Sequence, residues 1–478
     1  MGSTADEVLG LLERLRADDV PTHGGRTLGY VYDSGLAEAD EVGRTALAAY
    51  GGSNGLDPTA FPSILAMEND LVALVGGQVD APDGYTGVVT SGGTESILLT
   101  VLAARDAAGL PDPSMVLPTT AHAAFHKAAH YFGVRPVLVD VDPATFRADP
   151  DAMAAAVDAT TVLLVASAPS YAHGVVDPVG AVAAIGAERG IRVHVDACIG
   201  GWVLPFLDDV VPWTFGVPGV TSVSVDLHKY GYAPKGVSVL LHRDARLRRD
   251  HFFASSDWPG YTMLNATMQS TKSGGPIAAA WAVARLIGLD GYATLAASAR
   301  EATLAVADAF GSGRSDAGLR PLTRPDSTLL ALGAGEGLDV YAVADQMRER
   351  GWLLQVQLPY AAGPPSLHLS LCAATAPLVP DLVAALGESA QAARAAGPTP
   401  IPPQIAGVMA RLDPGRVDEA SFDGLLAGLG LTPESSGAPA LPERMAPINA
   451  LLGAAPPALR DALLLAFLDR LSRPRRMP

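Results

Sequence analysis

The feature that most constrains the fold is a regular alternation of two kinds of segment between residues 85 and 242. Short apolar runs rich in valine and leucine, such as TVLLVASAP, alternate with alanine-rich amphipathic stretches, such as PVGAVAAIGAERG. Strands that alternate with helices predict a mostly parallel sheet with helices on both faces, and nearly continuous apolar strands suit burial on both sides. We therefore expect an α/β fold. Strands are expected within residues 85–90, 114–120, 135–141, 161–169, 191–197, 220–228 and 235–242.

The composition excludes several classes of protein. The 478 residues are 49% apolar and 17% charged, so the chain can bury a sizeable core. The net charge of −17 argues against a nucleic-acid-binding surface, which would need a basic face. Two cysteines, Cys198 and Cys372, do not suggest a disulfide framework or a cysteine-based metal cluster.

The chain begins with an acidic helical pattern in which Thr4 and Glu7 have the spacing of a capping box. This start lacks the basic head and apolar run of a signal peptide. No apolar run approaches the length of a membrane span. We expect a cytoplasmic protein, and the alanine-, glycine- and proline-rich composition is typical of a high-GC bacterium.

Changes of pattern along the chain predict four segments. A helical segment occupies 1–60, the large α/β domain 61–290, and a smaller α+β domain 291–395. A proline-rich hinge and helical tail follow at 396–478. The period of PALRDALLLAFLDRL suits an amphipathic helix packed on the protein or on a neighbour, with membrane contact as the alternative.

Chemically distinctive residues follow four of the expected strands. In parallel α/β sheets such residues gather at the carboxyl ends of the strands, so we expect them in one crevice. TSGGTES, with Gly93 and Thr94, joins a strand to a helix and suits a phosphate, although an ordinary glycine turn has the same pattern. His122 can stack on a flat ring. Its spacing to His126 also fits a metal pair, but no third ligand accompanies them, so no metal site is expected.

The other two residues are a carboxylate and an amine. Asp196 ends an apolar strand, where a carboxylate caps the next turn or meets a cation such as a protonated ring nitrogen. Lys229 follows the next strand. An apolar setting disfavours its charged form and makes the neutral amine available for Schiff-base formation. A phosphate cradle, a stacking imidazole, a ring-nitrogen carboxylate and a Schiff-base lysine are together what pyridoxal 5'-phosphate (PLP) needs.

Longer blocks resemble a known family, the fold type I PLP enzymes and in particular sphingosine-1-phosphate lyase. The blocks are TSGGTESILL, HAAFHKAAHYFGV, HGVVDPV, HVDACIGGW, DLHKYGYAPKG, DWPGYT, SGGPIAAAWA and RERGWLLQVQLP. The related group II decarboxylases share the histidine, aspartate and His-Lys elements but not the continuation KYGYAPKG. The resemblance implies a mostly parallel, seven-stranded-type sheet in a large PLP-binding domain with a smaller α+β C-terminal domain.

The resemblance also implies roles for particular residues. Lys229 would form the Schiff base, and Tyr171, Lys229 or a cofactor phosphate oxygen would be the catalytic base. Ser270 would approach from the second subunit of a homodimer. Cofactor contacts are implied for Gly93, Thr94, His122, Ser167, Asp196, His228, Lys229 and Ser270. Substrate contacts are implied for Tyr32, Asn54, Tyr171 and Lys235.

The implied reaction is cleavage of the Cα–Cβ bond of an amino alcohol or β-hydroxy amine to an aldehyde and a small amine. One departure bears on the substrate. In SNGLDPTAFPS, Asp57 stands where the family has a histidine directed at the substrate phosphate. A carboxylate repels a phosphate dianion, so we expect a substrate without phosphate, or with a polar or cationic group there, unless Asp57 caps the next turn. Alternatives are an L-amino-acid decarboxylase and a cofactor-free regulatory homologue.

Overall fold

The computed structural model of the protein describes residues 2–311, 317–361, 363–428 and 444–472. The chain forms two compact units. The first unit comprises residues 1–304, 325–329 and 370–378, and the second comprises 305–324, 330–369 and 379–478.

A seven-stranded sheet in the order β1-β7-β6-β5-β4-β2-β3 forms the centre of the first unit. The five strands from β6 to β3 are parallel, whereas β7 runs antiparallel to both of its neighbours, β1 and β6. This arrangement confirms the expected α/β class. The strands are β1 (Thr86–Thr90), β2 (Ser114–Pro118), β3 (Arg135–Val139), β4 (Thr161–Ser167), β5 (Arg192–Asp196), β6 (Ser222–Asp226) and β7 (Ser238–His242).

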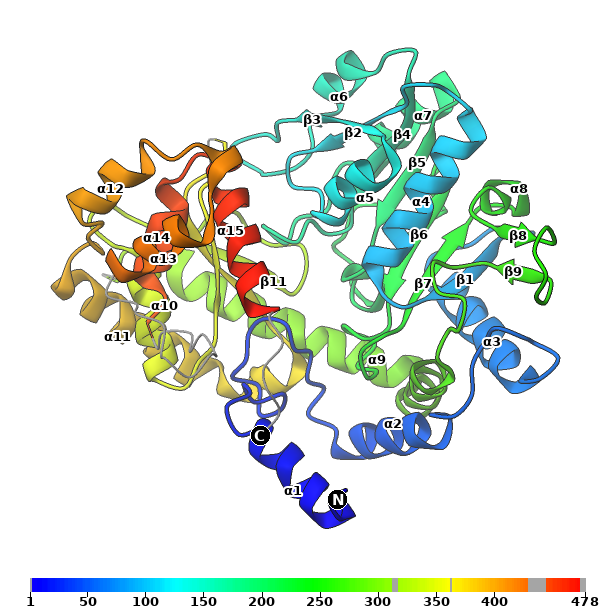
Figure 1. Cartoon of the computed structure of the whole chain (residues 1–478), viewed down its shortest axis with the longest axis horizontal. Coiled ribbons are helices and arrows are strands. Elements are labelled where there is room, and N and C mark those ends of the chain that lie inside the picture. The colour runs from blue at the N-terminus through cyan, green and yellow to red at the C-terminus, as the bar shows by residue number, and fades with distance from the viewer. Residues whose placement is uncertain (1, 312–316, 362, 429–443, 473–478) are drawn as a thin grey trace. The chain divides into compact units, whose positions relative to one another are not determined.

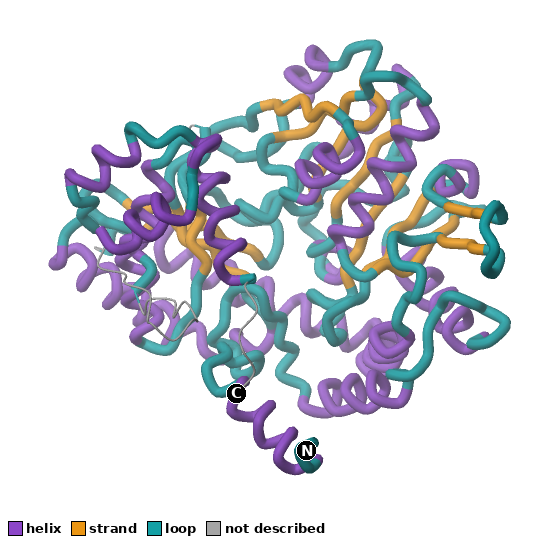
Figure 2. The backbone as a smooth tube through the Cα atoms, viewed as in Figure 1, coloured by secondary structure: helices purple, strands orange, loops and turns teal. Residues whose placement is uncertain are grey.

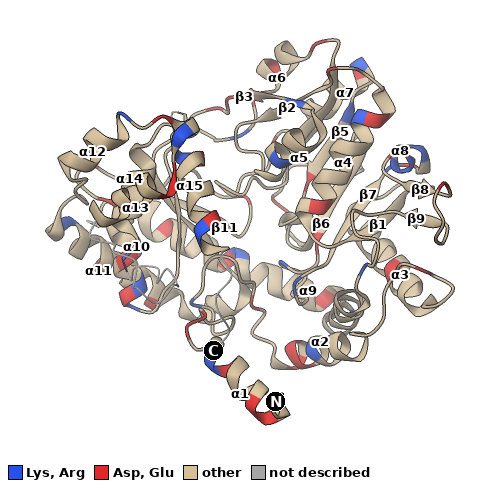
Figure 3. Cartoon of the chain, in the orientation of Figure 1, with Lys and Arg blue, Asp and Glu red and all other residues tan. Residues whose placement is uncertain are grey.

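Alternate residues of the strands pack on opposite faces of this sheet. On β4, Leu163 and Val165 join the core beneath α4 (Gly93–Ala108) and α5 (Ala124–Phe132), while Leu164 and Ala166 join the core that includes α3 (Pro62–Gln78) and α7 (Val179–Arg189). Figure 1 shows α4 and α5 together on one face. Strands β1, β2, β4 and β7 carry no Lys, Arg, Asp or Glu (Figure 3), as burial on both faces requires.

Further elements complete the first unit. The Thr4 and Glu7 capping box is present and starts α1, which confirms that prediction. A small hairpin, β8 with β9, projects beside the main sheet (Figure 2). The long helix α9 bends at Gly288, where φ is 64°. The bounds are α1 (Ala5–Leu15), α2 (Ala37–Ala49), α6 (Pro150–Ala156), α8 (Ala245–Arg249), β8 (Phe253–Ser255), β9 (Met263–Asn265) and α9 (Gly274–Gly311).

The second unit contains a four-stranded sheet in the order β10-β11-β13-β12 and a group of helices near the C-terminus. The predicted tail helix is present as α15, whose Leu459 and Leu463 are buried in a core with α12, α13 and α14. None of the described helices has the length and apolar character needed to cross a membrane. The bounds are β10 (Leu319–Pro321), β11 (Leu329–Ala334), α10 (Val340–Glu349), β12 (Gln355–Gln357), β13 (Ser366–Ser370), α11 (Val379–Ala396), α12 (Pro403–Met409), α13 (Glu419–Gly428), α14 (Ala446–Ala454) and α15 (Pro457–Leu471).

Candidate active site

A cavity of about 420 Å³ lies in the first unit, where the loops that follow β1, β2, β5 and β6 come together. The parallel direction of these strands explains why distant parts of the sequence meet there. Seven of the residues predicted for the site line this cavity: Gly93, Thr94, His122, Asp196, His228, Lys229 and Lys235.

The glycine-rich turn between β1 and α4 forms one wall of the cavity. Helix α4 begins at Gly93, and no side chain caps its first turn. A Cβ atom at Gly93 would lie 2.6 Å from the Cys198 sulfur and 3.0 Å from both carboxylate oxygens of Asp226, so only glycine fits. Free backbone N–H groups and the helix dipole at such a terminus attract an anion such as a phosphate.

Lys229 contacts a buried carboxylate on the floor of the cavity. Its Nζ lies 3.0 Å from Oδ2 of Asp226, and Nε2 of His228 lies 3.7 Å from the same oxygen. Burial alone would lower the pKa of Lys229, but Asp226, with Tyr32, Cys198 and Asp196, outweighs burial and raises this pKa well above its ordinary value. Burial would likewise raise the pKa of Asp226, but Lys229 and His228 lower it.

These contacts correct one expectation from the sequence. We predicted that an apolar setting would favour the neutral amine of Lys229. That prediction is wrong for the free amine of Lys229, because the neighbouring Asp226 stabilises the ammonium form.

His122 and Asp196 both line this cavity. The backbone N–H of Ala124 donates to Nδ1 of His122 over 3.2 Å. His122 is exposed, but partial loss of hydration by neighbouring groups of the cavity lowers its pKa, so its ring is neutral near pH 7. Asp196 is 8% exposed and accepts the backbone N–H of Cys198. Ser167, at the end of β4, is the direct neighbour of Asp196 in the sheet.

The predicted substrate residues Tyr32 and Lys235 lie together. Nζ of Lys235 is 4.8 Å from the centre of the Tyr32 ring and donates to the backbone oxygen of His228 over 3.1 Å. Partial burial and repulsion from Lys229 lower the pKa of Lys235 to about 8. Tyr171 is close enough to Tyr32 to contribute to the raised pKa of that phenol, after the larger effect of burial.

Six of the predicted residues lie outside the lining of this cavity: Ser167, Tyr32 and Tyr171, described above, and Asn54, Asp57 and Ser270. Asp57 and Ser270 line a second cavity of about 1010 Å³, beside the β8–β9 hairpin. The Asp57 carboxylate is bound locally, since Oδ1 accepts the N–H of Thr59 at 2.8 Å and its hydroxyl at 2.6 Å. Asn54 accepts the N–H of Leu56 and forms a β-bridge with Ser273.

Sequence reasoning missed Asp226 and Cys198, which both line the first cavity. Asp226 could have been found, because it ends a predicted strand and stands three residues before Lys229 in DLHK. Cys198 carries no comparable signal, since a lone buried thiol is ordinary core packing.

The residues of the first cavity fit PLP. The uncapped start of α4 suits the phosphate, Asp196 suits the ring nitrogen, His122 suits the ring face, and Lys229 suits the aldehyde. The close approach that Gly93 permits is consistent with such a cradle.

Comparisons with known proteins agree with this chemistry. Residues 43–310 match the model "Pyridoxal-dependent decarboxylase conserved domain", and residues 403–470 match "Pyridoxal-dependent enzyme, C-terminal putative HTH domain". The sphingosine-1-phosphate lyase of Dictyostelium discoideum is 35% identical over 76% of this chain and 69% of its own length. A "Probable L-tyrosine/L-aspartate decarboxylase" of Methanothrix thermoacetophila is 31% identical over 73% of this chain and 87% of its own.

A solved structure extends the comparison to three dimensions. The structure of a Burkholderia pseudomallei sphingosine-1-phosphate lyase has a TM-score of 0.77 and 35% sequence identity to this chain, covering 83% of it and 92% of that structure.

Proposed function

Because the chain belongs to the sphingosine-1-phosphate lyase family of pyridoxal-dependent enzymes, we propose that it cleaves the Cα–Cβ bond of a β-hydroxy amine to an aldehyde and a smaller amine. The observation that carries this proposal is the meeting of His122, Asp196 and Lys229 with the uncapped start of α4 on one cavity. The protein is a PLP-dependent lyase. What we propose is the kind of substrate that it cleaves and the role of each residue in the site.

PLP, when bound, accepts the electrons released by the broken bond. Lys229 would link the cofactor to the protein, and Asp196 would keep the ring nitrogen protonated. His122 would contact the ring face, and the N–H groups at the start of α4, with Thr94, Ser167 and His228, would hold the phosphate. These assignments use side chains and helix positions that the fold already brings together.

The remaining task is removal of the proton from the substrate hydroxyl. Tyr171 and Lys229 are the candidate bases. Lys235, beside the Tyr32 ring, would meet the polar head of the substrate. Since the pKa of Lys235 is about 8, the group is mostly cationic at pH 7 and suits an anionic or strongly polar head group.

A homodimer would explain where Ser270 and Asp57 act. Both residues line the second cavity, next to the exposed side chains of Phe253, Tyr261 and Leu264. We propose that this surface contacts the second copy and that Ser270 reaches the partner's cofactor site. The two free, buried cysteines, Cys198 and Cys372, suit the reducing cytoplasm in which we expect the enzyme to act.

Subunit mixing tests the shared site. Lys229→Ala and Ser270→Trp should each be inactive as homodimers. Exchange of subunits should restore about a quarter of wild-type activity, because half of the dimers then hold one intact site of two. No recovery after verified exchange would place Lys229 and Ser270 in sites of one subunit.

The reaction itself is tested by mass spectrometry of the products formed from phosphorylated and unphosphorylated sphinganine, with Lys229→Ala as the negative control. Aldehyde from either substrate supports carbon–carbon cleavage, and the ratio of the two reports the head-group preference. Carbon dioxide released from L-tyrosine or L-aspartate without any aldehyde would instead establish the decarboxylase alternative, which the Methanothrix relative supports.

A further inference from the structure

Asp226 is a buried carboxylate with no part in the cofactor contacts described above. It ends β6 and is 1% exposed. One carboxylate oxygen, Oδ2, faces Nζ of Lys229 at 3.0 Å and Nε2 of His228 at 3.7 Å. The other oxygen, Oδ1, has no hydrogen-bond partner within the described part of the chain.

A buried carboxylate is costly unless a cation compensates it. His228 compensates it poorly, since burial lowers the pKa of this imidazole and outweighs the raising effects of Asp226 and of the Val237 backbone oxygen, which lies 2.6 Å from Nδ1. The closest cation is therefore the Lys229 ammonium. The acidic and basic groups that face Lys229 from the surrounding elements are Asp196, Cys198, Asp226, Tyr32, His122, His228 and Lys235.

The spacing of the two residues makes the contact local and rigid. Asp226 and Lys229 are three positions apart in DLHK, and the buried strand β6 fixes the aspartate. Gly93 has no side chain, and its Cα packs so closely against Asp226 that a Cβ would lie 3.0 Å from both carboxylate oxygens. The carboxylate cannot swing toward α4, so it stays aimed at the lysine.

We propose that Asp226 is a positioning residue that holds the free amine of Lys229 on the cofactor face of the cavity and keeps a proton on it. The inference rests on the role proposed for Lys229 in linking the cofactor. It gives that lysine a second state, an ammonium held ready to return a proton whenever the covalent link is open. It also predicts that cofactor loading requires removal of this proton.

Covalent loading shows why the proton matters. The Nζ lone pair attacks the aldehyde carbon, a carbon–nitrogen double bond forms, and the carbonyl oxygen leaves as water. An ammonium has no lone pair, so Nζ must first lose one proton to solvent. In the wild-type protein Asp226 opposes that loss, and loading should become fast only at alkaline pH.

The test is the pH profile of cofactor loading, a readout independent of turnover. Protein freed of cofactor with hydroxylamine is mixed with PLP at a series of pH values, and the lysine-linked chromophore is followed by absorbance. Asp226→Asn should lower the pH of half-maximal loading rate by at least about one unit, which is about tenfold faster loading near pH 7. Asp226→Glu, which restores the charge, should move the profile back toward wild type.

Two further variants serve as controls. Asp250→Asn removes a carboxylate paired with Arg192 at 2.6 Å, outside the cavity lining, and should leave the profile unchanged. If Asp226→Asn does not fold, Asp226→Ser removes the same charge with a smaller side chain. The ionisation of PLP itself is common to all samples, so only differences between variants are interpreted.

Borohydride reduction followed by peptide mass spectrometry identifies the lysine that carries the cofactor. This measurement separates the proposed role of Lys229 from the proposed role of Asp226. An adduct on a lysine other than Lys229 would overturn both the proposed role of Lys229 and this inference. An adduct on Lys229 with the same pH midpoint in Asp226→Asn and wild type would overturn only the role of Asp226. Slower loading of Asp226→Asn at every pH, with an unchanged midpoint, would also overturn the role of Asp226, because an aspartate with a purely structural role would give that result.

Discussion

Asp57 illustrates how one residue can bear on substrate choice. Its carboxylate is exposed, and two hydrogen bonds from Thr59 lower its pKa, so it is anionic at neutral pH. The cavity it lines also contains Ser270. If that cavity adjoins the partner's substrate site, Asp57→His should raise kcat/KM for a phosphorylated substrate relative to its unphosphorylated form by about tenfold or more.

A matched change separates charge from local structure. Thr59→Val removes the 2.6 Å hydroxyl contact but leaves the Asp57 charge, so it should leave the substrate ratio nearly unchanged. An equal ratio in wild type and Asp57→His would show that this carboxylate only stabilises its own turn.

Individual residues of the site also differ in how far the sequence could predict them. Gly93, His122, Asp196 and Lys229 were predictable because each follows a recognisable strand, and strand ends converge. The protonation of Lys229 was not predictable from an apolar flank. It depends on one carboxylate at 3.0 Å, which only the conformation of the turn after β6 brings within reach.

At the scale of an element, the start of α4 depends on close packing. Gly93→Ala would place a Cβ 2.6 Å from the Cys198 sulfur, which is buried and cannot move away freely. We expect a loss of about 1–3 kcal/mol in the free energy of unfolding, and weaker PLP binding. Thermal unfolding with and without PLP measures both effects.

Gly180 in α7 is the matched control. It also lies near a helix start, but a Cβ there would meet nothing within 4 Å. Gly180→Ala should leave cofactor binding unchanged and stabilise the protein by up to about 1 kcal/mol. Equal behaviour of the two variants would mean that the turn before α4 has room to adapt.

Strand identity was predictable and strand order was not. Apolar runs marked each of the seven strands. Burial on both faces requires such runs in the inner strands, whereas the edge strand β3 is mostly exposed. The runs do not encode direction or neighbour, so the place of β7, antiparallel between β1 and β6, comes from the structure alone. The four-segment division of the chain stays a prediction.

At the scale of the whole molecule, buried histidines should make stability depend on acid pH. Burial lowers the pKa of His194 and of His251 to about 4, and that of His242 well below its ordinary value. Unfolded histidine takes up a proton near pH 6.5, so between about 6.5 and 4 the unfolded state binds more protons. The free energy of unfolding should be full above pH 6.5 and fall as the pH is lowered toward 4, by up to about 3 kcal/mol per histidine.

His251 is the best place to test this dependence. It is 4% exposed, and neither ring nitrogen has a hydrogen-bond partner in the described structure, so His251→Leu loses no buried bond. Circular dichroism should show its acid midpoint at lower pH than that of wild type, while the exposed His126→Leu behaves as wild type. An unshifted midpoint in His251→Leu would remove this histidine from the explanation.

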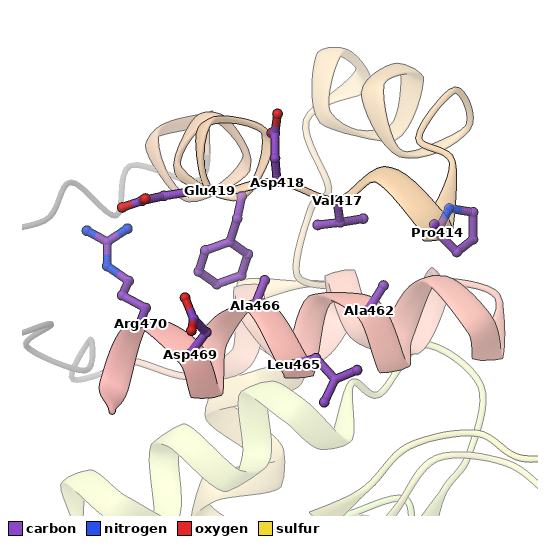
Figure 4. A pocket seen from close by; sticks show the side chains of 11 residues that line it. Pro414, Val417, Asp418, Glu419, Ala462, Leu465, Ala466, Asp469 and Arg470 are labelled. Atoms are coloured by element: carbon purple, nitrogen blue, oxygen red, sulfur yellow. The ribbon is translucent and has the colours of Figure 1, made fainter. Parts of the chain in front are cut away.

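The C-terminal helices match a family model named after the helix-turn-helix (HTH), a DNA-binding motif. Their net charge argues against DNA binding. Residues 403–470 contain five arginines, no lysine and eight acidic residues. Asp418 and Glu419 stand at the start of α13, and Asp469 of α15 lines the same pocket (Figure 4). Of the arginines, Arg416 and Arg470 already pair with acidic residues of the same helical group, Asp413 and Asp423.

Binding to the DNA backbone requires several basic side chains that neutralise phosphates. The acidic residues of this helical group would repel the DNA phosphates. We therefore expect the intact protein to bind a labelled DNA duplex with a Kd above about 10⁻⁴ M, even at low salt, as measured by fluorescence anisotropy. Saturable binding at micromolar protein that weakens as salt is added would contradict this expectation. The helical group would then need a basic surface from elsewhere in the assembled protein, because its own residues do not supply one.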